Sequence, residues 1–221
     1  MVAHPFIGRA VELAALREVM ATVLAGRPQT VLLTGPAGIG KTSLIEQFAD
    51  ELDDATIIRA NGEQWETLVA FGVVDQLLRA AGMGPLLVDR ESAVPPEGAG
   101  GVGETVLAVL EGFAQKGPLV LLIDDAQWAD FDSHRALLFA LRRLGACSVL
   151  TVLVERDVTE AGLPDGLRRL AGGTTGRSLV VDPLAVDAVQ RLAAELGVPD
   201  LSRQSARRLR EHTGGNPLFL R

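Results

Sequence analysis

The residues best suited to chemistry form a glycine-rich segment between an apolar run and a helical pattern. Residues 35–42 read GPAGIGKT, which matches the pattern G-x-x-x-x-G-K-[ST] of phosphate-binding loops. Glycines let the backbone bend so that successive N–H groups face phosphate oxygens, and the positive end of the following helix adds to this attraction. In this pattern we expect the Lys41 ammonium to reach the β- and γ-phosphates and the Thr42 hydroxyl to bind Mg²⁺. The residues predicted to hold the nucleotide here are Gly35, Pro36, Ala37, Gly38, Ile39, Gly40, Lys41, Thr42 and Ser43.

Two adjacent carboxylates follow a second apolar run, LVLLIDD at residues 119–125. A buried strand that ends in an acid presents it at the carboxyl edge of a parallel sheet, where ligands gather. We expect Asp124 to hold Mg²⁺ through water, and Asp125 to orient or deprotonate the attacking water. The alternatives are a strand-end cap for Asp124 and a solvated or structural carboxylate for Asp125.

Arg156 follows the apolar run 148–155 and is the third chemical candidate. A guanidinium at this place could sense the γ-phosphate or stabilise transferred charge. The alternative is a surface arginine that pairs with Glu155, Asp157 or Glu160.

Apolar runs and helical spacing indicate the elements that position these residues. Short apolar runs predict a parallel sheet of about five strands between helices, an α/β fold. The expected strands are 30–34, 55–60, 119–124, 148–155 and 178–181. The expected helices of this part are 42–52, 67–80, 102–115 and 131–144.

Two segments depart from this alternation. Residues 82–103 contain nine glycines or prolines and predict a mobile loop. After residue 184, two amphipathic helices follow with no strand between them, near 185–196 and 202–212. We therefore expect a nucleotide-binding core over residues 1–183 and a small helical lid over 184–221.

Composition and charge exclude several classes of protein. A chain of 221 residues that is 48% hydrophobic is not disordered as a whole. Net charge is −7, with −9 in residues 1–155 and +2 in residues 156–221, so a strongly basic nucleic-acid surface is absent. The lone Cys147 excludes an intramolecular disulfide and a cysteine-based zinc site. The apolar runs are too short to cross a bilayer, and without a signal-peptide pattern we expect a cytoplasmic protein with no membrane partner.

Several segments together resemble the ATPase module of large LuxR-type, MalT-like transcriptional regulators, which belong to the signal-transduction ATPases related to AAA+ and NB-ARC proteins. They are FIGR at 6–9, GPAGIGKTSL at 35–44, DDAQWAD at 124–130, the arginine at 156, VVDPL at 180–184 and TGGNPLFL at 213–220. The resemblance implies that DNA is contacted only through domains absent from this chain. It also implies nucleotide-dependent self-association of the full-length parent.

The resemblance implies roles for further residues. The backbone of Phe6, Ile7, Gly8 and Arg9 would line the adenine, and Pro217 would pack on the nucleotide from the lid. In the DDAQWAD signature, Trp128 is expected to pack, and Asp130 with Ser133 to cap the following helix. Two aromatic residues after the second strand, Trp65 and Phe71, are expected to pack in the core or a loop. Three arginines recur at helical spacing near the C-terminus and predict a solvated lid face, with a DNA-contacting face as the alternative: Arg203, Arg207 and Arg210.

These observations favour a switch in which Mg-ATP or Mg-ADP sets the angle between core and lid and ATP is hydrolysed slowly. One alternative is a metabolic P-loop kinase or hydrolase, which would need a second substrate pocket with a base. The other is an AAA+ DNA-loading ATPase, which the acidic balance of residues 1–155 disfavours.

Overall fold

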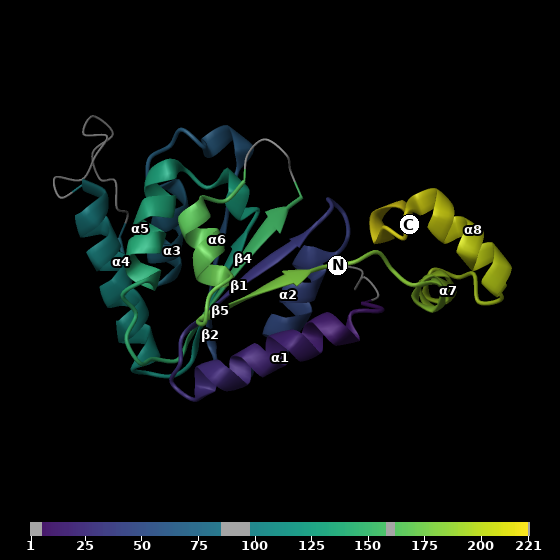
Figure 1. Cartoon of the computed structure of the whole chain (residues 1–221), viewed down its shortest axis with the longest axis horizontal. Coiled ribbons are helices and arrows are strands. Elements are labelled where there is room, and N and C mark those ends of the chain that lie inside the picture. Colours follow the sequence, from purple (N-terminus) through teal and green to yellow (C-terminus); the bar gives the residue numbers. More distant parts are fainter. Residues whose placement is uncertain (1–5, 85–97, 158–161, 221) are drawn as a thin grey trace.

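A computed structural model describes residues 6–84, 98–157 and 162–220 of the chain. Strands and helices alternate through most of it (Figure 1). The strands are β1 (Gln29–Gly35), β2 (Thr56–Asn61), β3 (Leu119–Asp124), β4 (Val149–Arg156) and β5 (Gly176–Val180). The helices are α1 (Ala10–Leu24), α2 (Lys41–Asp50), α3 (Gly72–Ala80), α4 (Gly98–Ala114), α5 (Phe131–Leu141), α6 (Asp165–Ala171), α7 (Val186–Glu195) and α8 (Arg203–Thr213).

The five strands form one parallel sheet in the order β2-β3-β4-β1-β5. Strand β1 lies inside the sheet, with Leu33 opposite Val154 of β4 on one side and Leu179 of β5 on the other. Because all strands point the same way, the residues that follow them meet at one edge. The predicted α/β fold with a five-stranded parallel sheet is confirmed.

Strands β1, β3 and β4 bury both faces because helices cover the sheet on two sides, whereas the edge strands β2 and β5 are partly exposed. Along β3, Leu119, Leu121 and Ile123 belong to the apolar core under α3, α4, α5 and α6. Val120 and Leu122 point the other way, into the core under α1 and α2. Figure 1 shows these two helical layers on opposite sides of the strands. This arrangement explains why β1, β3 and β4 are largely continuous apolar runs and do not alternate with polar residues.

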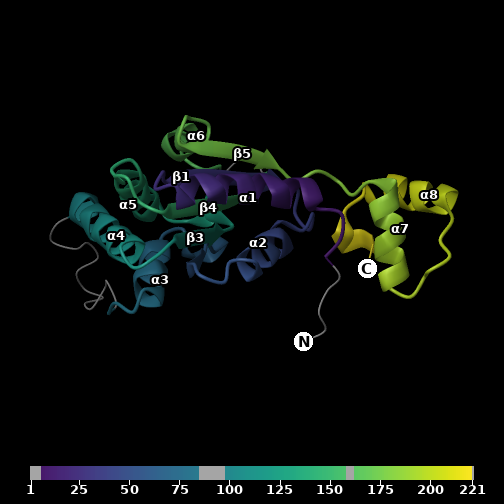
Figure 2. The same cartoon turned by 90° about the horizontal axis from the view of Figure 1, so that it is seen from below.

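The residues after β5 form α7, α8 and a terminal 3-10 turn, η3 (Pro217–Leu220). Both views place them at one end of the molecule, beyond the end of the sheet (Figures 1 and 2). They share a small apolar cluster of buried residues: Leu184, Ala188, Val189, Leu192 and Ala206. We call residues 184–220 the lid; the boundary at residue 184 itself stays a prediction. Within the described ranges, no helix has both the length and the apolar character that crossing a membrane requires.

Two expectations about elements are wrong. The loop predicted over 82–103 extends too far, because residues 98–103 belong to α4, where Val102 is buried in the core. Residues 85–97 of that predicted loop lie outside the described residues. The helix predicted over 67–80 begins only at Gly72. Phe71 has a left-handed φ of 60°, which is incompatible with a right-handed helix, so the helix cannot include Phe71 or extend through it to residue 67.

Candidate functional site

The loop between β1 and α2 bends sharply over the first turn of α2. Gly38 and Gly40 have φ angles of 74° and 97°, a region that glycine adopts without the strain that a side chain would cause. A Cβ atom on Gly38 would lie 2.7 Å from the Leu218 side chain of the lid. The loop is therefore shaped by glycine both for its own turn and for close approach of the lid.

Lys41 begins α2 and is buried beneath this loop. Its Nζ donates to the carbonyl oxygens of Gly35 at 2.8 Å and Pro36 at 2.9 Å. Burial lowers the pKa of Lys41, while the nearby carboxylates of Asp125 and Asp124 act in the opposite direction. An ammonium so placed can exchange carbonyl partners for phosphate oxygens with little movement.

Thr42 and Asp124 meet beside Lys41, where the Thr42 hydroxyl donates to Asp124 Oδ2 at 2.7 Å. A hydroxyl and a carboxylate are hard oxygen donors of the kind that Mg²⁺ prefers. Among the described residues, no group of three or more His, Cys, Asp or Glu could hold a metal ion. The pair therefore fits Mg²⁺ that keeps several waters and takes further ligands from phosphate, which is its usual mode of binding.

Asp125 and Arg156 face each other across the ends of β3 and β4. Arg156 Nε and Nη2 donate to the two carboxylate oxygens of Asp125 at 2.7 and 2.5 Å. Buried Gln127 joins both residues, because its Nε2 donates to Asp125 at 3.2 Å and its Oε1 accepts from the Arg156 N–H at 3.1 Å. The hydrogen bonds that Arg156 donates to Asp125 raise the pKa of Arg156, opposed by partial desolvation. The guanidinium is thus a fixed positive charge beside the site.

The surface pairing left open for Arg156 is not found among the described residues. Glu155, one of the expected partners, points into the protein and accepts from Arg168 Nη2 at 2.6 Å and from the Leu163 N–H at 2.8 Å. Glu160 lies outside the described residues. Within the described residues, Arg156 pairs with the second acid of the 124–125 pair and forms no ion pair with Glu155 or Asp157.

These groups surround one cavity of about 400 Å³ at the carboxyl edge of the sheet. Its lining residues are Ala37, Gly38, Gly40, Lys41, Thr42, Ser43, Asp124, Asp125, Arg156, Pro217 and Leu218. Gly35, Pro36 and Ile39 were predicted with this group but do not line the cavity. The carbonyls of the first two bind Lys41, and Ile39 is buried beneath the loop.

The N-terminal segment 6–9 connects the loop to the lid. Arg9 is buried, and its guanidinium donates to Asp182 O at 2.5 Å and to Ile39 O at 2.7 Å. A second, small cavity of about 40 Å³ adjoins it, lined by Phe6, Ile7, Arg9, Ile39, Gly40, Ser43, Leu184, Leu192 and Pro217. Gly8 lines neither cavity; a Cβ atom there would lie 2.8 Å from that of Ala188 in α7.

The lid touches the phosphate loop directly through Asn216, a contact that the sequence analysis missed. Asn216 is buried, and its Nδ2 donates to Ala37 O at 2.8 Å. Its Oδ1 accepts from the Leu218 N–H at 3.0 Å, which fixes the start of η3. Asn216 lies within the TGGNPLFL segment at 213–220, but no local pattern in the sequence indicates its contact with Ala37.

Gly62, directly after β2, is a second residue that the sequence analysis missed. Its N–H donates to Asp124 O at 2.9 Å, and a Cβ atom there would lie 2.4 Å from Asp125 O and 2.9 Å from Ala129 N. Only glycine allows the β2 end to lie so close to the acidic pair. A glycine after a predicted strand is a usable sign of such close approach.

The rest of the DDAQWAD segment fixes this loop to the protein. Asp130 Oδ1 accepts from the Ser133 N–H at 2.8 Å, so the predicted helix cap is confirmed. The same oxygen also accepts from the Phe71 N–H at 2.8 Å. His134 Nε2 bonds Ala126 O at 2.9 Å, and burial lowers the pKa of His134. The expectation for Trp65 is wrong, because it is 91% exposed, whereas Phe71 is buried.

Comparison with known proteins agrees with this geometry. The family model described as AAA ATPase domain matches residues 5–154. Among curated proteins, the ATP-dependent zinc metalloprotease FtsH 2 of Conexibacter woesei is 31% identical over 113 residues. That match covers 44% of this chain and 16% of the protease.

Solved structures match over nearly the whole chain. The ORC1 protein of Aeropyrum pernix, solved in complex with DNA, has a TM-score of 0.67 at 20% identity and covers 99% of this chain. Cdc6p from Pyrobaculum aerophilum has a TM-score of 0.63 at 15% identity and covers 100% of it. At these identities the likeness concerns the fold alone, and this chain spans 59% and 60% of the two proteins' lengths. Because the family model covers more than half of the sequence, the chain belongs to the AAA ATPase domain family.

Proposed function

We propose that this chain is a nucleotide-dependent switch that binds Mg-ATP or Mg-ADP between core and lid and hydrolyses ATP slowly. The observation that carries the proposal is the cavity in which Lys41, Asp124 and Arg156 of the core meet Pro217 and Leu218 of the lid. A ligand that contacts both core and lid favours the relative position of the two parts in which its contacts are strongest. Mg-ATP and Mg-ADP make different contacts, so they can favour different positions, which is the basis of a switch.

In the proposed reaction, water attacks the γ-phosphorus in line while the bond to the β-phosphate oxygen breaks, giving ADP and phosphate. Lys41 and the loop N–H groups hold the phosphates, and Asp125 orients the water and accepts its proton. Thr42 and, through water, Asp124 would hold Mg²⁺, which would neutralise phosphate charge when bound. Arg156 must divide its donors between Asp125 and the transferred phosphate, so we expect a slow reaction.

The proposed parent is a LuxR-type transcriptional regulator in the cytoplasm, as the sequence resemblance implies. DNA would then be bound by other domains of that parent, which would also self-associate in response to nucleotide. Sequencing the downstream part of the gene tests this part: a terminal helix-turn-helix supports it, and a cyclase or kinase domain contradicts it.

Nucleotide binding is tested by calorimetry with ATP and ADP on the wild type and two lysine variants. Lys41→Ala removes the ammonium at the cavity, whereas Lys116→Ala is a matched control whose side chain lies over the Phe113 ring. We expect binding to be lost only in Lys41→Ala, and the copurifying nucleotide to be ADP. A wild type without adenine-nucleotide affinity, or equal affinity in both variants, would overturn the proposal.

A second candidate function, a kinase or hydrolase with its own small-molecule substrate, rests on a neighbouring cavity of about 310 Å³. It lies beside the metal-binding pair and is lined by Thr42, Ile45, Glu46, Arg59, Ala60, Asn61, Gln76, Leu122 and Asp124. Turnover of ATP that rises several-fold with one metabolite of a screen, and falls in Arg59→Ala, would favour this candidate over the switch.

A further inference from the structure

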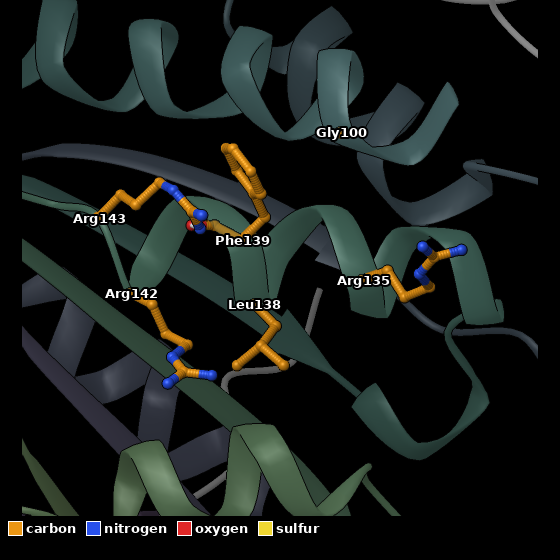
Figure 3. Close-up of a pocket in the computed structure, with 6 residues that line it drawn as sticks. All are labelled: Gly100, Arg135, Leu138, Phe139, Arg142 and Arg143. Atoms are coloured by element: carbon orange, nitrogen blue, oxygen red, sulfur yellow. Dashed lines mark hydrogen bonds between the residues drawn. The ribbon is translucent and has the colours of Figure 1, made fainter. Parts of the chain in front are cut away.

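A further cavity lies away from the nucleotide site, on the outer side of α5. It measures about 630 Å³ and is lined by Gly100, Arg135, Leu138, Phe139, Arg142 and Arg143. Figure 3 shows Phe139 and Arg143 on the side of α5 that faces α4, and Leu138 and Arg142 on the side that faces α6. We call these six residues the arginine groove.

Glycines on the neighbouring helices allow this groove to exist. A Cβ atom on Gly103 of α4 would lie 2.7 Å from the Phe139 ring, and one on Gly166 of α6 would lie 2.4 Å from Leu138. The side chains of Leu138 and Phe139 therefore lie close against α6 and α4, and these half-buried side chains form the floor of the groove. At Gly100 an added Cβ would meet nothing within 4 Å, so the groove is open there.

The three arginines have no carboxylate partner among the described residues. Arg143 is held instead by Phe139, with its guanidinium carbon 3.6 Å from the ring centroid and Nη1 donating to Phe139 O at 3.2 Å. Arg135 lies over the Phe131 ring at 5.6 Å. The acids on the adjoining elements form no ion pair with these arginines: Glu104 of α4, Asp132 of α5 and Asp165 of α6.

This concentration of positive charge, without ion pairs in the described part of the chain, stands out in a protein whose net charge is −7. Arg135 and Arg142 are exposed and seven residues apart, two helical turns or about 10.5 Å along α5. Carboxylates spaced by two turns on a second helix would match them, and apolar side chains between those carboxylates would meet Leu138 and Phe139.

We propose that the arginine groove docks an acidic amphipathic helix of a partner protein. The apolar floor and the acidic character of the rest of residues 1–155 disfavour nucleic acid, whose backbone would be repelled around the groove. This docking does not depend on nucleotide binding, since none of the lining residues belongs to the nucleotide site.

The test measures fluorescence anisotropy with a labelled amphipathic peptide of about 18 residues, five helical turns, that carries leucines flanked by glutamates. A second peptide has lysine in place of each glutamate. The protein variants are Arg135→Glu/Arg142→Glu in the groove and Arg203→Glu/Arg207→Glu on α8, an exposed pair with the same change in charge. Thermal unfolding shows that each variant is folded.

We expect only the glutamate peptide to bind, with affinity reduced about tenfold by the groove variant and little by the α8 variant. Gly100→Gln should weaken binding as well, because its side chain enters the open end without changing the charge. Equal losses in the two charge variants would show unspecific attraction and overturn the proposal. No binding of the glutamate peptide, or its displacement by duplex DNA at lower concentration than by unlabelled peptide, would also overturn it.

Discussion

At the scale of single residues, Gln127 holds together the two groups that flank the predicted reaction centre. One carboxamide donates to the Asp125 carboxylate and accepts from the Arg156 backbone, and it is buried, so water cannot replace it easily. Gln127 does not line the cavity itself. It is therefore a positioning residue, which acts through Asp125 and Arg156.

We predict that Gln127→Leu lowers kcat for ATP hydrolysis by about tenfold and leaves nucleotide affinity nearly unchanged. Asp125 and the backbone of Arg156 lose their hydrogen bonds to the Gln127 side chain. Lys41 and the loop that bind the phosphates are unchanged. Steady-state kinetics together with calorimetry separates the two effects. The exposed Gln64→Leu is the matched control, and an equal loss of affinity and kcat in Gln127→Leu would contradict the positioning role.

His134 predicts a dependence of stability on pH. Because burial lowers its pKa in the folded protein, the unfolded chain binds more protons between that lowered pKa and the ordinary value of about 6.5. The contribution is fully present above about pH 6.5 and is lost as the pH falls towards the folded pKa. Urea unfolding from pH 8 to 5 should show this slope in the wild type and in His212→Gln, whose ring is exposed, and a weaker slope in His134→Gln.

At the scale of elements, the end of β2 determines where the acidic pair can lie. Gly62 binds Asp124 O and has no room for a Cβ atom against the backbone of residues 125–129. We predict that Gly62→Ala destabilises the protein by about 1–3 kcal/mol, as overpacking does, and lowers hydrolysis further by displacing Asp125. Chemical denaturation and turnover measure this. Gly145→Ala, where an added Cβ meets nothing within 4 Å, should change neither.

The sequence predicted those elements whose signal is local. Strands β1, β3 and β4 are apolar runs buried on both faces, so their positions could be read directly. Helix α1 also had a signal, with Leu13, Leu16, Met20 and Val23 on one face, but it was not assigned. Helix α6 has only seven residues, including a glycine, which is too short for a periodic pattern.

Elements that depend on distant contacts could not be predicted. The start of α3 is set by the Phe71 N–H, which bonds Asp130, 59 residues later. Likewise, the motif placed Lys41, Thr42 and Asp124 in one site, but the contact of Asn216 with Ala37 spans 179 residues. Such contacts arise from packing, and no local pattern records them.

At the scale of the whole molecule, few polar contacts join lid and core. Among the described residues, Asn216 of the lid binds Ala37 O of the core, while Arg9 binds Ile39 O and Asp182 O within the core, just before the lid begins. The cavity between them, where the resemblance places the adenine, has about 40 Å³, room for little more than one water molecule. A purine base therefore enters only if the lid moves away from segment 6–9.

We predict that Asn216→Ala weakens nucleotide binding by about fivefold, the value of one hydrogen bond of about 1 kcal/mol. The lid then loses its direct bond to the phosphate loop while the core is unchanged. Hydrogen exchange in α8 should become faster in the variant and slower in the wild type when ADP is added. Gln204→Ala, on the exposed side of α8, is the control; nucleotide-independent exchange in the wild type would contradict a moving lid.

The position of β1 inside the sheet also has a consequence for synthesis of the chain. Its partners are β4, where Leu150 faces Gln29, and β5, where Gly176 faces Thr30, and neither exists when β1 leaves the ribosome. At about 5–20 residues per second, roughly 6–24 seconds pass before β4 follows. During that time the apolar strand that carries the phosphate loop is unpaired. The phosphate loop therefore reaches its folded surroundings only after β4 and β5 have been made, so nucleotide cannot assist the early steps of folding.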